Sequence, residues 1–136
     1  ILREYGEEKF SRKIAKKIVE ERKRKRIKST LQLVEIVRKI VPRSKINPAT
    51  RTFQAIRIET NKELENLESV LPQALKLLNR SGKLFIISFH SLEDRIVKNF
   101  IKNNQLELNK PITPSEQEIK SNPRSRSAKL RIILKK

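Results

Sequence analysis

The chain has 136 residues, enough for one domain of ordinary size, and carries 33 Lys and Arg against 15 Asp and Glu, a formal net charge of +18. Such an excess favours a polyanionic partner, with nucleic acid ahead of anionic lipid, although a lysine-rich composition that merely keeps the protein soluble is the alternative. Cysteine is absent, histidine occurs once and no apolar segment approaches the roughly 20 residues that span a bilayer, so we expect no metal site, no membrane contact and a cytoplasmic location.

Two amphipathic helices are predicted at the start of the chain. The first covers residues 7–26 and ends in five consecutive cations, Arg22 to Arg26. These cations either complement the helix dipole or contact phosphates, and the pattern leaves both interpretations open. The second helix is capped at Ser29, by its capping-box spacing, and stops at Pro42. A DNA-reading helix-turn-helix is disfavoured because the connecting loop lacks glycine.

A polar turn follows the second helix. Four side chains there supply hydroxyl, guanidinium and amide groups: Asn47, Thr50, Arg51 and Gln54. They suit the start of a helix, with Asn47 as the cap and Pro48 in the first position. From Asn61 onward, leucine spacing predicts another helix, in which Pro72 indicates a kink or a fresh start.

The run from Leu84 to Phe89 is apolar on both alternating faces, which predicts a strand covered on both sides. Ser91 and Asp94 have the spacing of a helix N-cap and its third-position acid, so a helix is predicted next. Ligands bind at the carboxyl ends of strands in open α/β sheets, which makes His90, Ser91, Asp94 and Arg95 candidate site residues. Turn and cap chemistry is the alternative, and such close neighbours cannot form a hydrolytic triad.

The remaining chain predicts two short strands around a short helix. Residues 106–108 alternate like a strand, and Thr113 with the proline and acid after it predicts a helix to about Ser121. A polar basic loop and an edge or antiparallel strand over residues 128–134 complete the chain. Three cations lie in or next to this loop: Arg124, Arg126 and Lys129.

A strand covered on both faces needs neighbouring strands, and this chain offers few. It also contains no Met, so we expect it to be the C-terminal part of a larger protein. Only two glycines are present, which excludes a glycine-rich phosphate or dinucleotide loop within these residues.

Four long motifs occur in a specific order: YGEEKFSRKIAKKIV from Tyr5, NPATRTFQAIRI from Asn47, ISFHSLEDRIVK from Ile87, and KPITPSEQEIKSNPRSRSAKLR from Lys110. Together they closely resemble the C-terminal part of the bacterial small-subunit ribosomal RNA methyltransferase H family, also called MraW. The resemblance implies an α/β fold, namely the C-terminal portion of a Rossmann-like methyltransferase preceded by part of an inserted all-helical domain. Residues 1–50 would be part of the insertion, and residues 51–136 the C-terminal half of the catalytic domain.

The resemblance also implies a function. The family uses S-adenosyl-L-methionine to methylate N4 of a cytidine in the decoding region of 16S rRNA in the small ribosomal subunit. Its main cofactor loop and ribose-binding acid lie upstream, so we expect no cofactor-binding residue here and no activity from this chain alone. His90, Ser91 and Asp94 are then the catalytic candidates, and the other polar residues named above are the candidates for binding RNA. A non-catalytic basic nucleic-acid-binding module is the alternative.

Overall fold

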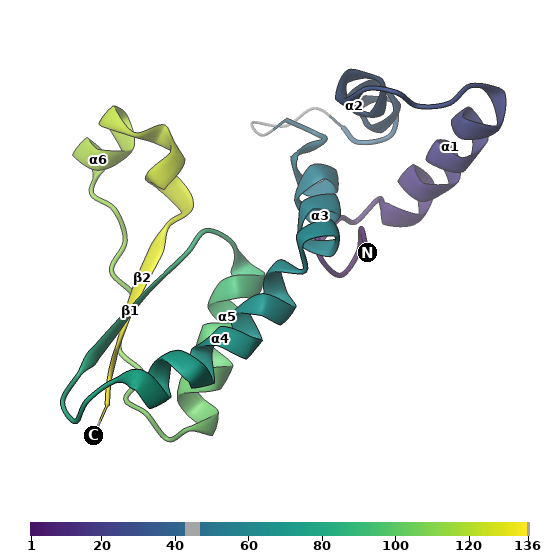
Figure 1. Cartoon of the computed structure of the whole chain (residues 1–136). Coiled ribbons are helices and arrows are strands. Elements are labelled where there is room, and N and C mark those ends of the chain that lie inside the picture. The colour runs from purple at the N-terminus through teal and green to yellow at the C-terminus, as the bar shows by residue number, and fades with distance from the viewer. Residues whose placement is uncertain (43–46, 136) are drawn as a thin grey trace. The chain divides into compact units, whose positions relative to one another are not determined.

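The computed structural model describes residues 1–42 and 47–135 and divides the chain into two compact units, Ile1–Glu63 and Leu64–Lys136 (Figure 1). The N-terminal unit is helical, and the C-terminal unit combines helices with two strands. None of the helices in the described part of the chain is long and apolar enough to cross a membrane.

The N-terminal unit contains α1 (Ser11–Arg24), α2 (Thr30–Arg38) and α3 (Thr50–Asn61). α1 is shorter than predicted, because residues before it form turns and Lys25 after it is extended. The predicted cap of α2 is confirmed, since the Ser29 hydroxyl accepts a hydrogen bond from the Gln32 N–H at 3.3 Å. α2 ends at Arg38, four residues before Pro42.

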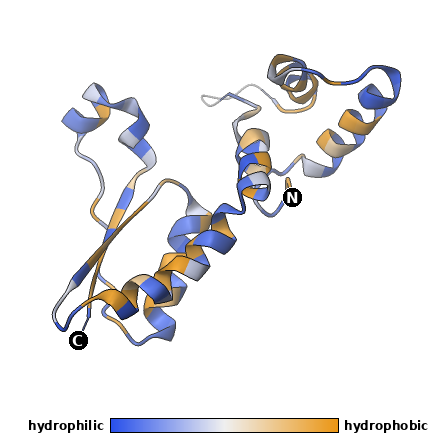
Figure 2. Ribbon diagram, in the orientation of Figure 1, coloured by the Kyte–Doolittle hydropathy of each residue, from blue (hydrophilic) through white to orange (hydrophobic). Residues whose placement is uncertain are grey.

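One apolar cluster holds the N-terminal unit together. Its fully buried members are Ile14 of α1, Val37 of α2 and Ala49 just before α3. Apolar stripes on α1 and α2 are visible in Figure 2, and the opposite faces are hydrophilic. Partly buried side chains complete the cluster: Leu2, Phe10, Ile18, Leu33, Val34, Ile40, Val41 and Phe53. The amphipathic spacing of the sequence therefore becomes a small helical core.

The start of α3 corrects the predicted cap. Ala49 is the N-cap residue, and the Asn47 Oδ1 atom accepts from the Ala49 N–H at 3.0 Å. Asn47 thus closes a turn before the helix, and Pro48 lies in that turn rather than in the first helical position. At its other end, α3 stops where Lys62 adopts a left-handed conformation with φ of 52°.

The C-terminal unit contains nearly all of α4 (Glu63–Leu77), then β1 (Lys83–Ser88), α5 (Ser91–Asn103), α6 (Glu116–Ser121), the 3-10 helix η1 (Pro123–Ser127) and β2 (Lys129–Leu134). α4 continues through Pro72 as one helix, so the predicted fresh start is wrong. The leucines on either side of Pro72 pack into the core of the unit, which offsets the lost backbone hydrogen bond.

β1 and β2 form an antiparallel pair whose register runs from Lys83 opposite Leu134 to Ser88 opposite Lys129. α4 and α5 cover one face, where Leu71, Val97 and Ile133 form the core. The predicted C-terminal strand is confirmed. Residues 106–108 are not a strand, because Leu106 instead packs against this core from an irregular segment.

The opposite face of β1 is bare within the described residues. Phe85 and Ile87 are each 58% exposed, whereas Leu84 and Ile86 between them face the helices. The sequence is therefore apolar on both faces of β1 although only one face is covered here. The prediction that both faces of β1 are covered was made for a longer chain than this one, so it stays a prediction.

Gly6 gives a test of packing in the N-terminal unit. A Cβ atom at this position would lie 2.6 Å from the Arg51 carbonyl oxygen and 2.7 Å from that of Leu2. Both are backbone atoms that cannot swing away, so Gly6→Ala should cost about 1–3 kcal/mol of stability. Hydrogen-exchange mass spectrometry should show faster exchange in α3, while the exposed Thr60→Ala control should not. Unchanged exchange in Gly6→Ala would contradict this packing.

Candidate functional site

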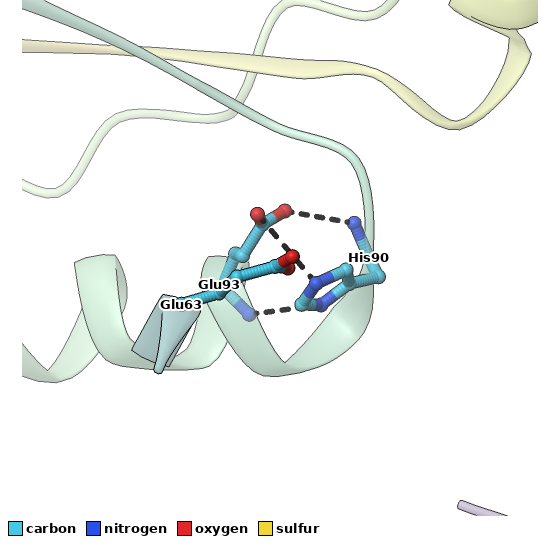
Figure 3. A group of neighbouring side chains, drawn as sticks. All are labelled: Glu63, His90 and Glu93. Carbon is cyan, nitrogen blue, oxygen red and sulfur yellow. Dashed lines mark hydrogen bonds and ion pairs between the residues drawn. The ribbon is translucent and has the colours of Figure 1, made fainter. Parts of the chain in front are cut away.

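A capping box closes the turn between β1 and α5. It begins one residue earlier than the sequence pattern predicts. His90, not Ser91, is the N-cap: its Nδ1 atom accepts from the Glu93 N–H at 3.3 Å (Figure 3). The Glu93 carboxylate accepts in return from the N–H groups of Phe89 at 2.7 Å and His90 at 3.3 Å. Glu63, also labelled there, ends the N-terminal unit and accepts two hydrogen bonds from Arg57.

The shift of the cap has a backbone cause. His90 is extended, with φ of −143° and ψ of 167°, and Ser91 is already the first helical residue. His90 and Glu93 also have the three-residue spacing of a capping box. The sequence therefore contained this pattern, but histidine is an uncommon cap residue. With only 9% of its side chain exposed, His90 acts here as a cap that fixes the turn.

Asp94 connects α5 to β2. Its Oδ1 atom accepts from Arg131 Nε at 2.7 Å, and its Oδ2 atom lies 3.3 Å from Lys129 Nζ. Both Asp94 and Arg131 are only 7% exposed. Burial alone would raise the pKa of the Asp94 carboxyl, but the hydrogen bonds and positive charges of Arg131 and then Lys129 hold this pKa below its ordinary value.

Arg131 is the main residue of this region that the sequence pattern did not single out. Besides binding Asp94, its Nη1 atom donates to the Asn109 carbonyl oxygen at 3.1 Å. Arg131 therefore joins β2, the first turn of α5 and the irregular segment between α5 and α6. One signal could have identified Arg131. Lys129 and Arg131 are two residues apart in a predicted strand, so both lie on the same face and either could pair with the candidate acid Asp94.

The other candidates at this strand end lie on the surface. Ser91 and Arg95 are exposed on α5, and Arg124 and Arg126 are exposed on η1. Lys129 differs from Arg124 and Arg126 because its ammonium group is already paired with Asp94. The structure thus brings Asp94 and Lys129 together. Arg124 and Arg126 stay exposed, where a ligand can reach them.

The four polar candidates of the N-terminal unit mostly serve local structure. Arg51 Nη1 donates to the Glu7 carbonyl oxygen at 3.4 Å, and Gln54 Nε2 donates to that of Tyr5 at 3.2 Å. Asn47 closes the turn already described, and Thr50 is the exposed first residue of α3. These contacts hold the N-terminal segment against α3, and no contact in the described part assigns the four residues to a ligand.

Neither glycine of the chain lies in a turn from a strand to a helix, which is the place of the glycine-rich loop in a nucleotide-binding site. Such a site needs backbone N–H groups in a glycine-rich loop between a strand and a helix. Gly6 instead packs against the backbone of α3, and Gly82 precedes β1, where a Cβ atom would lie 2.8 Å from the Asn79 carbonyl oxygen. Both glycines are therefore explained by packing.

These features define a basic protein in which a helical unit precedes a mixed helix–strand unit with a capped helix after its first strand. The family model described as "MraW methylase family" matches residues 1–136. The chain belongs to this family.

Curated relatives agree over almost the whole chain. Proteins named "Ribosomal RNA small subunit methyltransferase H" from Sulfurihydrogenibium sp. (strain YO3AOP1) and Ehrlichia chaffeensis (strain Arkansas) are 56% and 55% identical to it. The alignments cover 97% and 99% of this chain but 48% and 50% of the relatives. The chain thus spans about half the length of the curated relatives it matches.

The Asp94 ion pair predicts a pH-dependent stability. A carboxyl whose pKa is lowered by folding contributes stability above its unfolded pKa of about 3.9. This contribution is lost as the pH falls through the lower folded value. Asp94→Asn should lower the free energy of unfolding near neutral pH by about 3 kcal/mol, since it leaves Arg131 buried without a counter-charge.

The measurement is denaturant unfolding followed between pH 3 and 7. Asp94→Asn should lose less stability on acidification than the original protein, whereas the exposed control Glu118→Gln should match the original. The double variant Asp94→Leu/Arg131→Met should recover much of the loss, because it removes both buried charges. Equal pH dependence in Asp94→Asn and the original protein would contradict the ion-pair account.

Proposed function

We propose that the complete protein containing this chain transfers a methyl group from S-adenosyl-L-methionine to N4 of a cytidine in the decoding region of 16S rRNA. The observation that carries this proposal is the family match over residues 1–136, together with relatives named as ribosomal RNA small subunit methyltransferases. The formal charge of +18 supports an RNA substrate.

In this proposal the chain is the C-terminal portion of a Rossmann-like catalytic domain, preceded by part of an inserted helical domain. The bare apolar face of β1 supports it, because a strand of this composition is normally covered on both sides. We retain residues 1–50 as the insertion part and residues 51–136 as the catalytic part. The compact units divide at Glu63, so α3 packs with the N-terminal helices while belonging to the catalytic part in this assignment.

The strand end at His90 is the proposed position of the target cytidine. Methylation of an exocyclic amine depends on aligning the nitrogen lone pair with the methyl group, so positioning matters more than acid–base strength. The His90–Glu93 capping box and the Asp94–Arg131 pair would supply a rigid edge for this positioning. The main cofactor site would lie in the half of the protein that this chain does not contain.

The cations at the end of α1 are the proposed RNA-binding surface of the N-terminal unit. All five from Arg22 to Arg26 are exposed, but α1 ends at Arg24 and Lys25 is extended. Helix-dipole complementation therefore accounts for the first three cations and leaves Lys25 and Arg26 without that role. Contact with phosphates accounts for the whole run.

The direct test of the proposed function is product analysis. The complete protein, incubated with S-adenosyl-L-methionine and small ribosomal subunits that lack the modification, should yield N4-methylcytidine in digests of the 16S rRNA. The 136-residue chain alone should yield none and should show no heat of cofactor binding in calorimetric titration. A different methylated nucleoside, or RNA binding without methylation by the complete protein, would favour another activity or the non-catalytic alternative.

The α1 surface predicts a change in salt dependence. Replacing Arg22 to Arg26 with Gln in the complete protein should weaken RNA binding regardless of sequence. The slope of log affinity against log salt concentration should become shallower by about 0.7 for each phosphate of single-stranded RNA that the variant no longer neutralises. The matched control neutralises Arg12, Lys13 and Lys16, exposed cations nearer the start of α1. If both sets reduce the slope equally per charge, the run at the end of α1 has no special role.

A further inference from the structure

Residues 113–128 form a compact excursion from the two-stranded sheet, which we call the pinched loop. Its ends meet at an isolated bridge, where Ile112 and Leu130 exchange two backbone hydrogen bonds of 2.9 Å. Between these points the chain forms α6 and η1, and Figure 1 shows both extending beyond the end of the strand pair.

The pinched loop is ordered by hydrogen bonds more than by apolar packing. The Ser115 hydroxyl caps α6 by accepting from the Glu118 N–H at 3.2 Å. Ser125, only 5% exposed, donates its hydroxyl to the Asn122 carbonyl oxygen at 2.8 Å. Its backbone N–H also donates to Asn122, and Ala128 N–H donates back to Ser125 at 2.8 Å. The loop therefore has a defined shape although most of its residues are exposed.

The base of the pinched loop is fixed at the carboxyl end of β1. The antiparallel register places Ser88, the last residue of β1, opposite Lys129, where the loop rejoins β2. Lys129 and Arg131, on either side of the bridging Leu130, both bind Asp94 in the first turns of α5. The loop thus emerges beside the strand end at which ligands of open α/β sheets bind.

The pinched loop carries charge on both of its helices: α6 contains Glu116, Glu118 and Lys120, whereas η1 contains two cations and no acid. Arg124 and Arg126 lie two residues apart in this short helix and are exposed, and neither pairs with a carboxylate in the described part of the chain. Lys129 is close in sequence, but its ammonium group already lies 3.3 Å from the Asp94 carboxylate, which it shares with Arg131. Guanidinium groups bind phosphate oxygens through a planar set of donors, which makes the two arginines suited to a nucleic-acid backbone.

We propose that Arg124 and Arg126 form a phosphate-binding surface that holds the RNA backbone next to the nucleotide at the carboxyl end of β1. Asp94 is a positioning residue for this surface, acting through Lys129 and Arg131, and Lys129 itself contacts no phosphate. This inference rests on the proposed function, and it assigns one surface of the RNA contact to the pinched loop.

The test compares two charge-matched double variants of the complete protein. Arg124→Gln/Arg126→Gln removes the proposed contacts, and Lys98→Gln/Lys102→Gln removes two exposed cations of α5. The probe is a fluorescent transcript of the small-subunit RNA segment around the target cytidine, titrated by anisotropy at several salt concentrations. The arginine variant should bind about tenfold more weakly, with a salt slope shallower by about 1.4. The lysine variant should change little.

Asp94→Asn separates positioning from net charge. It makes the protein more positive, so electrostatics alone would strengthen RNA binding, whereas loss of the anchor should weaken it. Circular dichroism establishes that each variant is folded at the assay temperature. Tighter binding by folded Asp94→Asn would overturn the positioning role, and equal effects of the two double variants would overturn the phosphate surface. Methylation by the original protein tests the proposed function separately, since these failures leave it intact.

Discussion

The C-terminal unit depends on the ion pair that Asp94 makes with Arg131. It joins the helix after β1 to the neighbouring strand, at the end of the sheet where the chain turns from strand to helix. Because both groups are buried, neither can lose its partner without leaving a desolvated charge. The same ion pair draws in Lys129 and Asn109, so the turn, β2 and the base of the pinched loop form one connected structure.

Most of the helices and strands could be predicted from local sequence patterns. The apolar run of β1, the amphipathic spacing of α5 and the Ser29 cap of α2 each depend on residues close together, and the structure confirms all three. The identity of the α5 cap was less accessible, because Ser91 is a commoner cap than His90 and both have an acid three residues later. Residues 106–108 alternate like a strand, but tertiary packing of Leu106 decides their conformation.

The candidate site was predicted only in outline, for a physical reason. Spacing placed His90 and Asp94 at the end of a strand, but the partner of Asp94 lies 37 residues away on β2. Only the antiparallel register brings Arg131 to it, and nothing local in the sequence specifies that register. Similarly, Lys129 resembles the other loop cations in sequence, and only the structure distinguishes the paired lysine from the exposed arginines.

The central claim is that β1 belongs to a larger sheet, of which the described residues contain β1 and β2. Hydrogen-exchange mass spectrometry of the peptide covering β1 tests it most directly, measured in the complete protein and in the 136-residue chain under the same conditions. If further strands pair with β1 and further helices cover Phe85 and Ile87, its amides should exchange far more slowly in the complete protein. Equal exchange rates in both would contradict the claim. They would indicate that β1 pairs with β2 alone.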